Sequence, residues 1–244
     1  MEIGEGEIFG LAGQSGSGKS TFALALLGLL EARAQVKGSI LFRGQELTRF
    51  NERDWLRLRG REIALIPQNP LGSLNPCLRL GTQFQEAWTV HRKDAKAQWR
   101  DEALRALDAA SLPVKEDFLR RYPRELSVGM AQRVLIAMAL LHRPRLILAD
   151  EATSALDLIT QAEILKLFQE INRTYGASLL FITHDLAAAA QICHRLAVLH
   201  QGEVVECGQT AQMFERPVHP YTRKLMDALP WRAASARQAL QSFQ

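Results

Sequence analysis

The chain has 244 residues, of which 47% are hydrophobic, so it can bury a substantial core and is not expected to be disordered. Its net charge of +4 does not by itself select nucleic acid, anionic lipid or nucleotide as a partner. No apolar run reaches the ~18 residues of a membrane-spanning helix, and the N-terminus lacks the basic region of a secretory signal. These properties predict a soluble, cytoplasmic protein.

Short apolar runs alternate with segments of helical periodicity along most of the chain. Strands are predicted at residues 7–13, 38–44, 62–68, 145–151 and 178–185, and a hairpin at 195–208. Helical segments follow several of these strands, and this order predicts a mainly parallel sheet covered by helices. The basic segment at 53–62 alternates arginine with apolar residues, which favours a solvated helix face over a binding patch.

The pattern changes between residues 78 and 142, where strand-like runs disappear and helical segments dominate. We expect a helical sub-domain there, inserted into an α/β core that comprises residues 1–77 and 143–208. Residues 209–244 are expected to form a helical tail, whose last residues, 233–244, form a frayed amphipathic end. The chain 1–244 is thus predicted to be one domain.

Residues 13–21, GQSGSGKST, match the phosphate-loop pattern G-x-x-x-x-G-K-[ST]. An apolar strand precedes this loop and an apolar helix follows it, an order that a simple helix-capping turn would not explain. Lys19 is expected to reach the β- and γ-phosphates of a nucleotide, and the Ser20 hydroxyl to ligate Mg²⁺. The predicted nucleotide-binding residues of the phosphate loop are Gly13, Gln14, Ser15, Gly16, Ser17, Gly18, Lys19, Ser20 and Thr21.

Two adjacent carboxylates, Asp150 and Glu151, end a later apolar strand. In a phosphate-loop NTPase such an aspartate holds Mg²⁺ and a following glutamate can polarise the attacking water. Capping of the helix that begins near Leu158 is the alternative for this motif alone. Together with the phosphate loop, the pair predicts binding and hydrolysis of a nucleoside triphosphate.

Four further motifs complete a resemblance to the nucleotide-binding subunits of ABC transporters. They are Gln68 in IPQNP, LSVGM at 126–130, SALD at 154–157 and His184 in ITHD. The motifs occur in the family's order and cover nearly the whole chain. Within the family, the chain is most similar to the ATPases of oligopeptide, dipeptide and nickel importers. This similarity is carried by PQNPLGSLNP (67–76), QRVLIAMALL (132–141) and HPYTRKLMDALP (219–230).

The resemblance implies a P-loop NTPase core that binds ATP and Mg²⁺ between two subunits packed head to tail. It implies that Glu151 is the general base and that His184 contacts the γ-phosphate. Gln68 would sense the metal and the water, and would join Ser20 and Asp150 as the metal-site residues.

In the same arrangement Ser127 and Gly129 would touch the partner's γ-phosphate, and Asp157 would lie at the dimer interface. The second ATPase subunit would be identical or homologous. Two transmembrane permease subunits and, indirectly, a solute-binding protein would complete an importer for peptides or nickel. The chain would be peripheral to the cytoplasmic face of the inner membrane, and nucleic acid is not an expected partner.

The chain departs from the family pattern in two places. Ahead of the phosphate loop the family has additional strands and an aromatic residue that stacks on adenine, whereas here the one aromatic is Phe9, which is expected in the core. A late start assignment or a real loss would explain this, and a real loss would leave an open sheet edge and weaker adenine selectivity. In the signature, Val128 and Ala131 replace an expected glycine and basic residue. A β-branched residue tolerates a helical first turn but resists positive φ, so we expect a half-site that is slower or conformationally stiffer but competent.

Two rival functions remain. A soluble ABC-type ATPase of DNA repair or translation would usually carry a long coiled coil, zinc-binding cysteine pairs or two cassettes, and the sequence displays none of these. A degenerate, non-hydrolysing subunit is disfavoured by Glu151 and His184 but kept open by Val128 and the short N-terminus.

Overall fold

A computed structural model describes residues 1–31, 33–92 and 96–229 of the chain. The expected amphipathic end at 233–244 lies outside these ranges. None of the helices within them is both long and apolar enough to cross a membrane.

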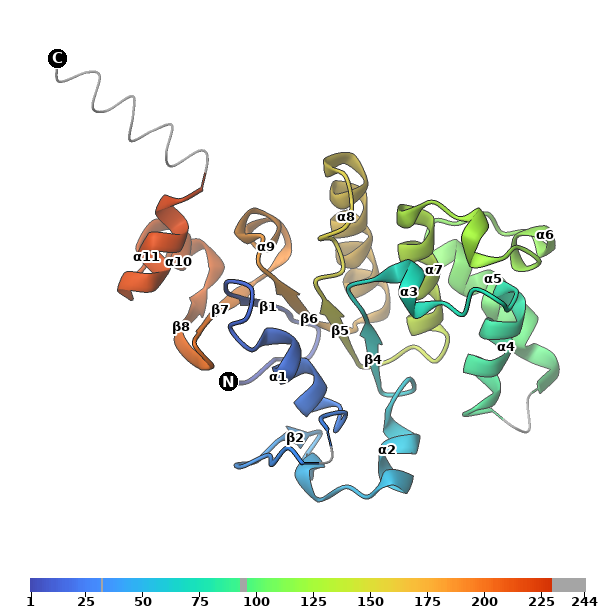
Figure 1. Ribbon diagram of the computed structural model, residues 1–244, viewed down its shortest axis with the longest axis horizontal. Helices are drawn as coiled ribbons and strands as arrows, with labels where there is room; N and C mark the ends of the chain where they lie inside the picture. Colours follow the sequence, from blue (N-terminus) through green and yellow to red (C-terminus); the bar gives the residue numbers. More distant parts are fainter. Residues whose placement is uncertain (32, 93–95, 230–244) are drawn as a thin grey trace, which may run out of the picture.

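A six-stranded sheet forms the centre of the molecule (Figure 1). Its strands are β1 (Ile8–Ala12), β4 (Ile63–Ile66), β5 (Leu146–Asp150), β6 (Ser178–Thr183), β7 (Arg195–His200) and β8 (Glu203–Gln209). They are arranged in the order β4-β5-β6-β1-β7-β8. All neighbours are parallel except β7 and β8, which form the expected antiparallel hairpin. The predicted α/β fold with a mainly parallel sheet is confirmed.

Helices cover both faces of this sheet because its strands are apolar on both sides. Ile8 and Ala12 of β1 pack in one core cluster with α7 (Val128–Leu140), α8 (Leu158–Tyr175) and α9 (Leu186–Ile192). Phe9 and Leu11 point the other way, toward α1 (Lys19–Leu26) and α2 (Glu52–Leu58). The two layers appear on opposite sides of the sheet in Figure 1. Phe9 is fully buried, as expected for a core residue.

The region beyond the β4 edge of the sheet is helical (Figure 1). It contains α3 (Pro70–Ser73), α4 (Leu80–Thr89), α5 (Trp99–Ala109) and α6 (Glu116–Leu119), together with α7. No strand occurs within the described residues of 78–142. Short 3₁₀ helices lie at Leu47–Arg49, Lys96–Gln98 and Pro123–Glu125. At the opposite edge, α10 (Thr210–Glu215) and α11 (Pro220–Asp227) follow β8.

The strand predicted at 38–44 does not join the main sheet. Instead β2 (Leu41–Phe42) and β3 (Gln45–Glu46) form a separate antiparallel hairpin. Its two turn residues, Arg43 and Gly44, have φ values of 50° and 77°, as a type I′ turn requires. The Glu46 carboxylate accepts hydrogen bonds from Ser39, Ile40 and Thr48, so it closes the hairpin locally instead of extending a long strand.

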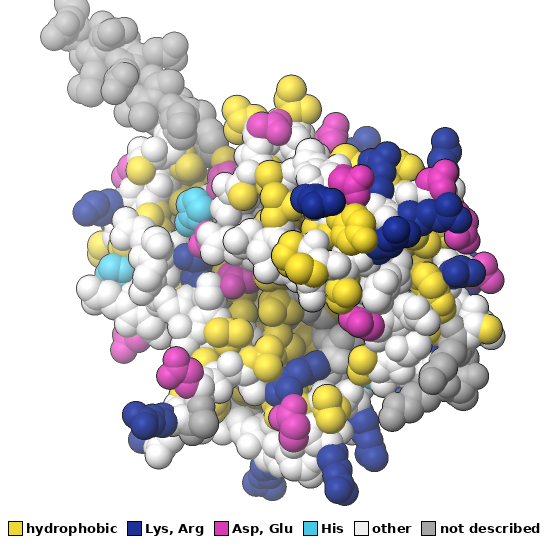
Figure 2. All heavy atoms as spheres, turned by 45° about the vertical axis from the view of Figure 1, so that its right-hand side comes forward, with side chains coloured by type: hydrophobic (Ala, Val, Ile, Leu, Met, Phe, Trp, Pro, Cys, Tyr) yellow, Lys and Arg dark blue, Asp and Glu magenta, His cyan; other side chains and the backbone are white. Residues whose placement is uncertain are grey.

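The basic segment at 53–62 forms α2 and the turn after it. The helix starts at a capping box in which the Asn51 and Asp54 side chains bond to each other's backbone amides. Arg53 and Arg57 are exposed while Trp55 and Leu58 are buried, as expected for a solvated helix face. Leu56 departs from this pattern because it is exposed as well. On the face in Figure 2, basic side chains are scattered among hydrophobic and acidic ones.

Candidate nucleotide site

The phosphate loop joins β1 to α1 at the carboxyl end of a central strand. All five residues of β1 are buried, which fixes the start of the loop in the sheet. Gly16 and Gly18 have φ values of 79° and 104°, in the left-handed region that favours glycine. A Cβ on Gly13 would lie 2.3 Å from the carbonyl oxygen of Leu199, so no side chain fits there.

Lys19 crosses the phosphate loop and joins it to the second motif. Its ammonium donates hydrogen bonds to the carbonyl oxygens of Gly13 at 2.9 Å and Gln14 at 3.0 Å. The same Nζ lies 3.5 Å from Glu151 Oε1, and the lysine side chain is buried. The phosphate-loop cation and the glutamate predicted as general base are therefore in direct contact.

Ser20 and Asp150 place two side-chain oxygen atoms next to each other beside the loop. The Ser20 hydroxyl donates to Asp150 Oδ1 at 3.1 Å. Burial raises the pKa of the Asp150 carboxyl above its ordinary value, and the negative charge of Glu151 raises it further. The hydrogen bond from Ser20 and the positive charge of Lys19 lower this pKa and so oppose the shift. A hydroxyl and a carboxylate oxygen are ligands that Mg²⁺ prefers, so these two residues fit the metal that accompanies a nucleotide.

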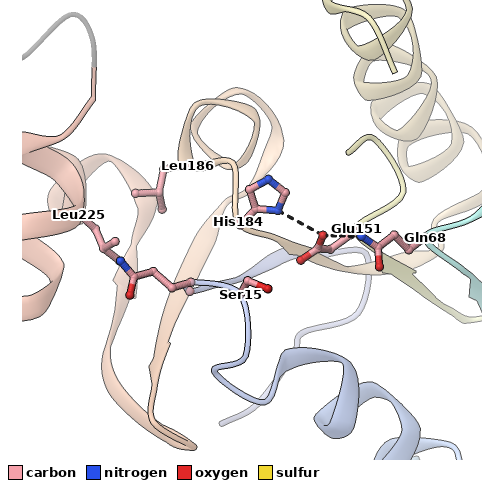
Figure 3. A pocket seen from close by; sticks show the side chains of 8 residues that line it. Ser15, Gln68, Glu151, His184, Leu186 and Leu225 are labelled. Atoms are coloured by element: carbon pink, nitrogen blue, oxygen red, sulfur yellow. Dashed lines mark hydrogen bonds and ion pairs between the residues drawn. The ribbon is translucent and has the colours of Figure 1, made fainter. Parts of the chain in front are cut away.

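Glu151 is the centre of the polar cluster (Figure 3). It follows β5 with a φ of 47°, a conformation that is uncommon outside glycine. Its Oε2 accepts a hydrogen bond from Gln68 Nε2 at 3.0 Å and lies 3.2 Å from His184 Nδ1. The glutamate side chain is 12% exposed and that of His184 is 52% exposed, so the histidine forms the open side of the cluster.

These residues line a cleft of about 420 Å³. Figure 3 shows Glu151, Gln68 and His184 together, with Ser15, Leu186 and Leu225 across the cleft from Glu151. The lining comprises Gly13, Gln14, Ser15, Gln68, Glu151, His184, Leu186 and Leu225. The structure thus brings the phosphate loop, both carboxylates, Gln68 and His184 to one place.

Ser127 and Gly129 do not line this cleft; they lie at the N-terminus of α7. Ser127 is the N-cap of that helix, and its Oγ accepts a hydrogen bond from the Met130 amide at 3.2 Å. A Cβ on Gly129 would lie 2.7 Å from Thr160 Cγ2 of α8. Thr160 in turn donates to Asp157, the N-cap of α8. The signature loop and the SALD segment are therefore neighbours within one chain.

Val128 occupies the first helical position of α7 and is 38% exposed as a residue. The difficulty of a positive φ for a β-branched residue does not arise, because the backbone there is helical. What Val128 changes is the surface next to Ser127.

Two contributors to the cleft were not predicted as site residues. Leu186 begins α9, directly after the His184 motif, and Leu225 lies in α11 at the far end of the chain. The segment that contains Leu225 stood out in the sequence as a family marker, but no local pattern predicts that it packs beside the phosphate loop.

Comparison with known proteins gives matches over most of the chain. Residues 1–154 match the model of the ABC transporter family, and residues 205–243 match that of the oligopeptide/dipeptide transporter C-terminal region. The chain is 44% identical to the oligopeptide transport ATP-binding protein OppD of Escherichia coli over 225 residues, which span 92% of this chain and 67% of OppD. It is 43% identical to the dipeptide transport ATP-binding protein DppD of Escherichia coli over 229 residues, 93% of this chain and 70% of DppD.

Solved structures agree with these matches. The ATP-binding cassette MJ0796, in a dimeric post-hydrolysis state bound to ADP and Pi, matches with a TM-score of 0.75 and 30% identity, over 86% of this chain and 88% of that one. CbiO1 from Clostridium perfringens, part of the ABC transporter complex CbiONQ, matches with a TM-score of 0.78 and 25% identity, over 97% of this chain and 90% of that one.

Proposed function

This chain belongs to the ABC transporter family and is an ATPase, and on that premise we propose that it powers a peptide importer. The observation that carries the proposal is the meeting of Lys19, Gln68 and His184 around Glu151, beside the phosphate loop. Peptide as the cargo is supported by the similarity to OppD and DppD and by the match to the oligopeptide/dipeptide C-terminal region. Nickel, the other cargo suggested by the sequence, has no counterpart in the names of these relatives.

The phosphate loop would hold the nucleotide through its backbone amides and Lys19. The glycine conformations turn loop amides inward at the start of α1, where a helix N-terminus favours negative charge. A γ-phosphate would compete for Lys19 with its present partners, Gly13 O, Gln14 O and Glu151. Ser20 and Asp150 would hold Mg²⁺, which neutralises charge on the β- and γ-phosphates when bound.

Glu151 would act as the general base. Its carboxylate would accept a proton from the water that attacks the γ-phosphorus, as the bond from phosphorus to the β,γ-bridging oxygen breaks and ADP leaves. Gln68 and His184 contact its Oε2 and would hold the carboxylate in place for this step. Because His184 is half exposed, its ring could also reach the γ-phosphate.

The site would be completed by a second ATPase subunit. Ser127 and Gly129 lie at the α7 N-terminus, outside the cleft, so they would act on a nucleotide held by another chain. Head-to-tail pairing would put the signature loop of each chain opposite the phosphate loop of the other. ATP would then stabilise the closed dimer, and loss of the γ-phosphate would release it.

The helical sub-domain at 78–142 would transmit the closing movement of the dimer to two permease subunits. Gln68 follows β4, just before α3 and the sub-domain at 78–142, so it links the cleft to that region. The chain would accordingly be peripheral to the cytoplasmic face of the membrane, with a solute-binding protein as an indirect partner.

Affinity purification of the tagged chain from membranes of its source organism tests this assignment. We expect a complex with a second cassette and two permeases, with ATPase activity that rises when a peptide-loaded binding protein is added. An ATPase recovered with nucleic-acid enzymes or ribosomes would favour the DNA-repair or translation alternative. A complex without hydrolysis would favour the degenerate subunit.

A further inference from the structure

The C-terminal segment of the described chain touches the phosphate loop directly. The backbone amide of Gln14 donates a hydrogen bond to the Tyr221 hydroxyl at 3.4 Å, across 207 positions of sequence. Leu225, one turn later on α11, lines the same cleft as Gln14 and Ser15, and Figure 3 shows it on the side of the cleft away from Glu151. A helix that follows the last strand therefore forms one wall of the nucleotide site.

Tyr221 is held in place by a set of anchors from the β7–β8 hairpin. The Glu206 carboxylate accepts hydrogen bonds from the amides of Val218 at 2.8 Å and His219 at 2.9 Å. His219 Nδ1 accepts from the Tyr221 amide at 3.2 Å, and the His200 ring stacks on the Tyr221 ring with centroids 3.7 Å apart. The turn and the ring are fixed independently of the phosphate loop.

The Gly13–Gln14 peptide unit is bound at both of its ends. Its carbonyl oxygen accepts from Lys19 Nζ at 2.9 Å, and its amide donates to Tyr221. Because a trans peptide is planar, with its oxygen and hydrogen on opposite sides, these two contacts together fix its orientation. The same hairpin supports the rest of the loop, since the Gly202 amide donates to Ser17 O at 3.0 Å.

We propose that Tyr221 is a positioning residue for the phosphate loop, a role that rests on the proposed ATP-binding function. When Lys19 turns to the phosphates, Tyr221 remains as the contact that holds the Gly13–Gln14 peptide in its orientation. The nucleotide site and the C-terminal segment are thereby linked. Nucleotide binding should stabilise the position of Tyr221, and loss of the Tyr221 contact should weaken nucleotide binding.

The test compares Tyr221→Phe with Tyr175→Phe in the full chain. Phenylalanine keeps the ring on His200 and removes only the acceptor oxygen. Tyr175, partly exposed at the end of α8, provides the same chemical change away from the cleft. We expect Tyr221→Phe to raise the Kd for Mg-ATPγS, and the KM for ATP, roughly three- to ten-fold, the range for one neutral hydrogen bond. The kcat and the melting temperature of Tyr221→Phe should equal those of the unaltered chain. Tyr175→Phe should match the unaltered chain in all of these measurements.

Hydrogen exchange gives a second readout. Amides of residues 13–18 should exchange faster in Tyr221→Phe, and Mg-ATPγS should protect residues 217–225 in the unaltered chain more than in the variant. Equal Kd for Mg-ATPγS and equal hydrogen exchange in Tyr221→Phe and the unaltered chain would overturn the positioning role. A lower melting temperature of Tyr221→Phe, with faster exchange along the whole chain, would overturn it as well, because it would indicate a general loss of stability. Failure of the unaltered chain to bind Mg-ATPγS would instead reject the proposed function.

Discussion

Lys19 Nζ lies 3.5 Å from Glu151 Oε1, and both side chains are largely shielded from water. One residue follows β1 and the other follows β5, two strands that are not neighbours in the sheet. Electrostatic interactions are stronger in such a shielded site than in water, so a phosphate that draws Lys19 away also changes the environment of Glu151. If Glu151 is the general base, as proposed, this one contact would couple phosphate binding to its activation.

Glu151→Gln should lower the rate of ATP hydrolysis at least about 100-fold, because the amide cannot accept the proton from water. Affinity for ATP should be equal or higher, since a negative charge near the phosphates is removed. Turnover under saturating Mg-ATP and equilibrium binding measure the two effects. Glu170→Gln on the exposed face of α8 is the matched control. Retained turnover in Glu151→Gln would show that another group is the base.

Asp150→Asn should separate stability from catalysis. Burial raises the pKa of this carboxyl, so in the absence of Mg²⁺ its charged form destabilises the folded chain as the pH rises through that pKa. The variant should melt at a higher temperature than the unaltered chain at neutral pH, and this difference should shrink as the pH falls and Asp150 becomes protonated. Hydrolysis should be lost at every pH. A difference in melting temperature that grows on acidification would contradict the assigned cause.

Gly129→Ala should destabilise the chain by roughly 1–3 kcal/mol, the usual effect of forcing an extra methyl into a packed position. The new Cβ would lie 2.7 Å from Thr160 Cγ2. Thr160→Ser removes that methyl and keeps the hydroxyl that donates to Asp157. The double variant should therefore regain most of the lost stability in urea unfolding. Independent, additive effects of the two changes would refute the contact.

Val128→Gly and Val128→Ala should raise turnover in the assembled transporter, because both remove bulk beside Ser127, which in the proposed head-to-tail dimer would face the partner's nucleotide. Val128 already has helical backbone, so alanine should not destabilise α7, and glycine should destabilise it by no more than about 0.5 kcal/mol. Unchanged turnover in both variants would make this departure from the family pattern neutral.

The parts of the site that sequence could predict are those fixed by local pattern. Gly16 and Gly18 predict the phosphate loop, and Asp150 and Glu151 end an apolar strand whose carboxyl end must share an edge with β1. The positive φ of Glu151 had no such signal. The tight hairpin of β2 and β3 is closed by local hydrogen bonds to Glu46, and it replaced the single strand that the apolar run predicted. The approach of Tyr221 to Gln14 joins opposite ends of the chain, and only packing of α11 against the hairpin creates it.

Uptake of a labelled peptide into proteoliposomes tests the central claim most directly. The vesicles would contain the purified transporter, with its binding protein on one side and Mg-ATP on the side of this chain. We predict peptide accumulation that requires ATP and is lost with Glu151→Gln, and no accumulation of Ni²⁺ under the same conditions. Accumulation of Ni²⁺ instead of peptide, or peptide uptake that persists with Glu151→Gln, would contradict the account.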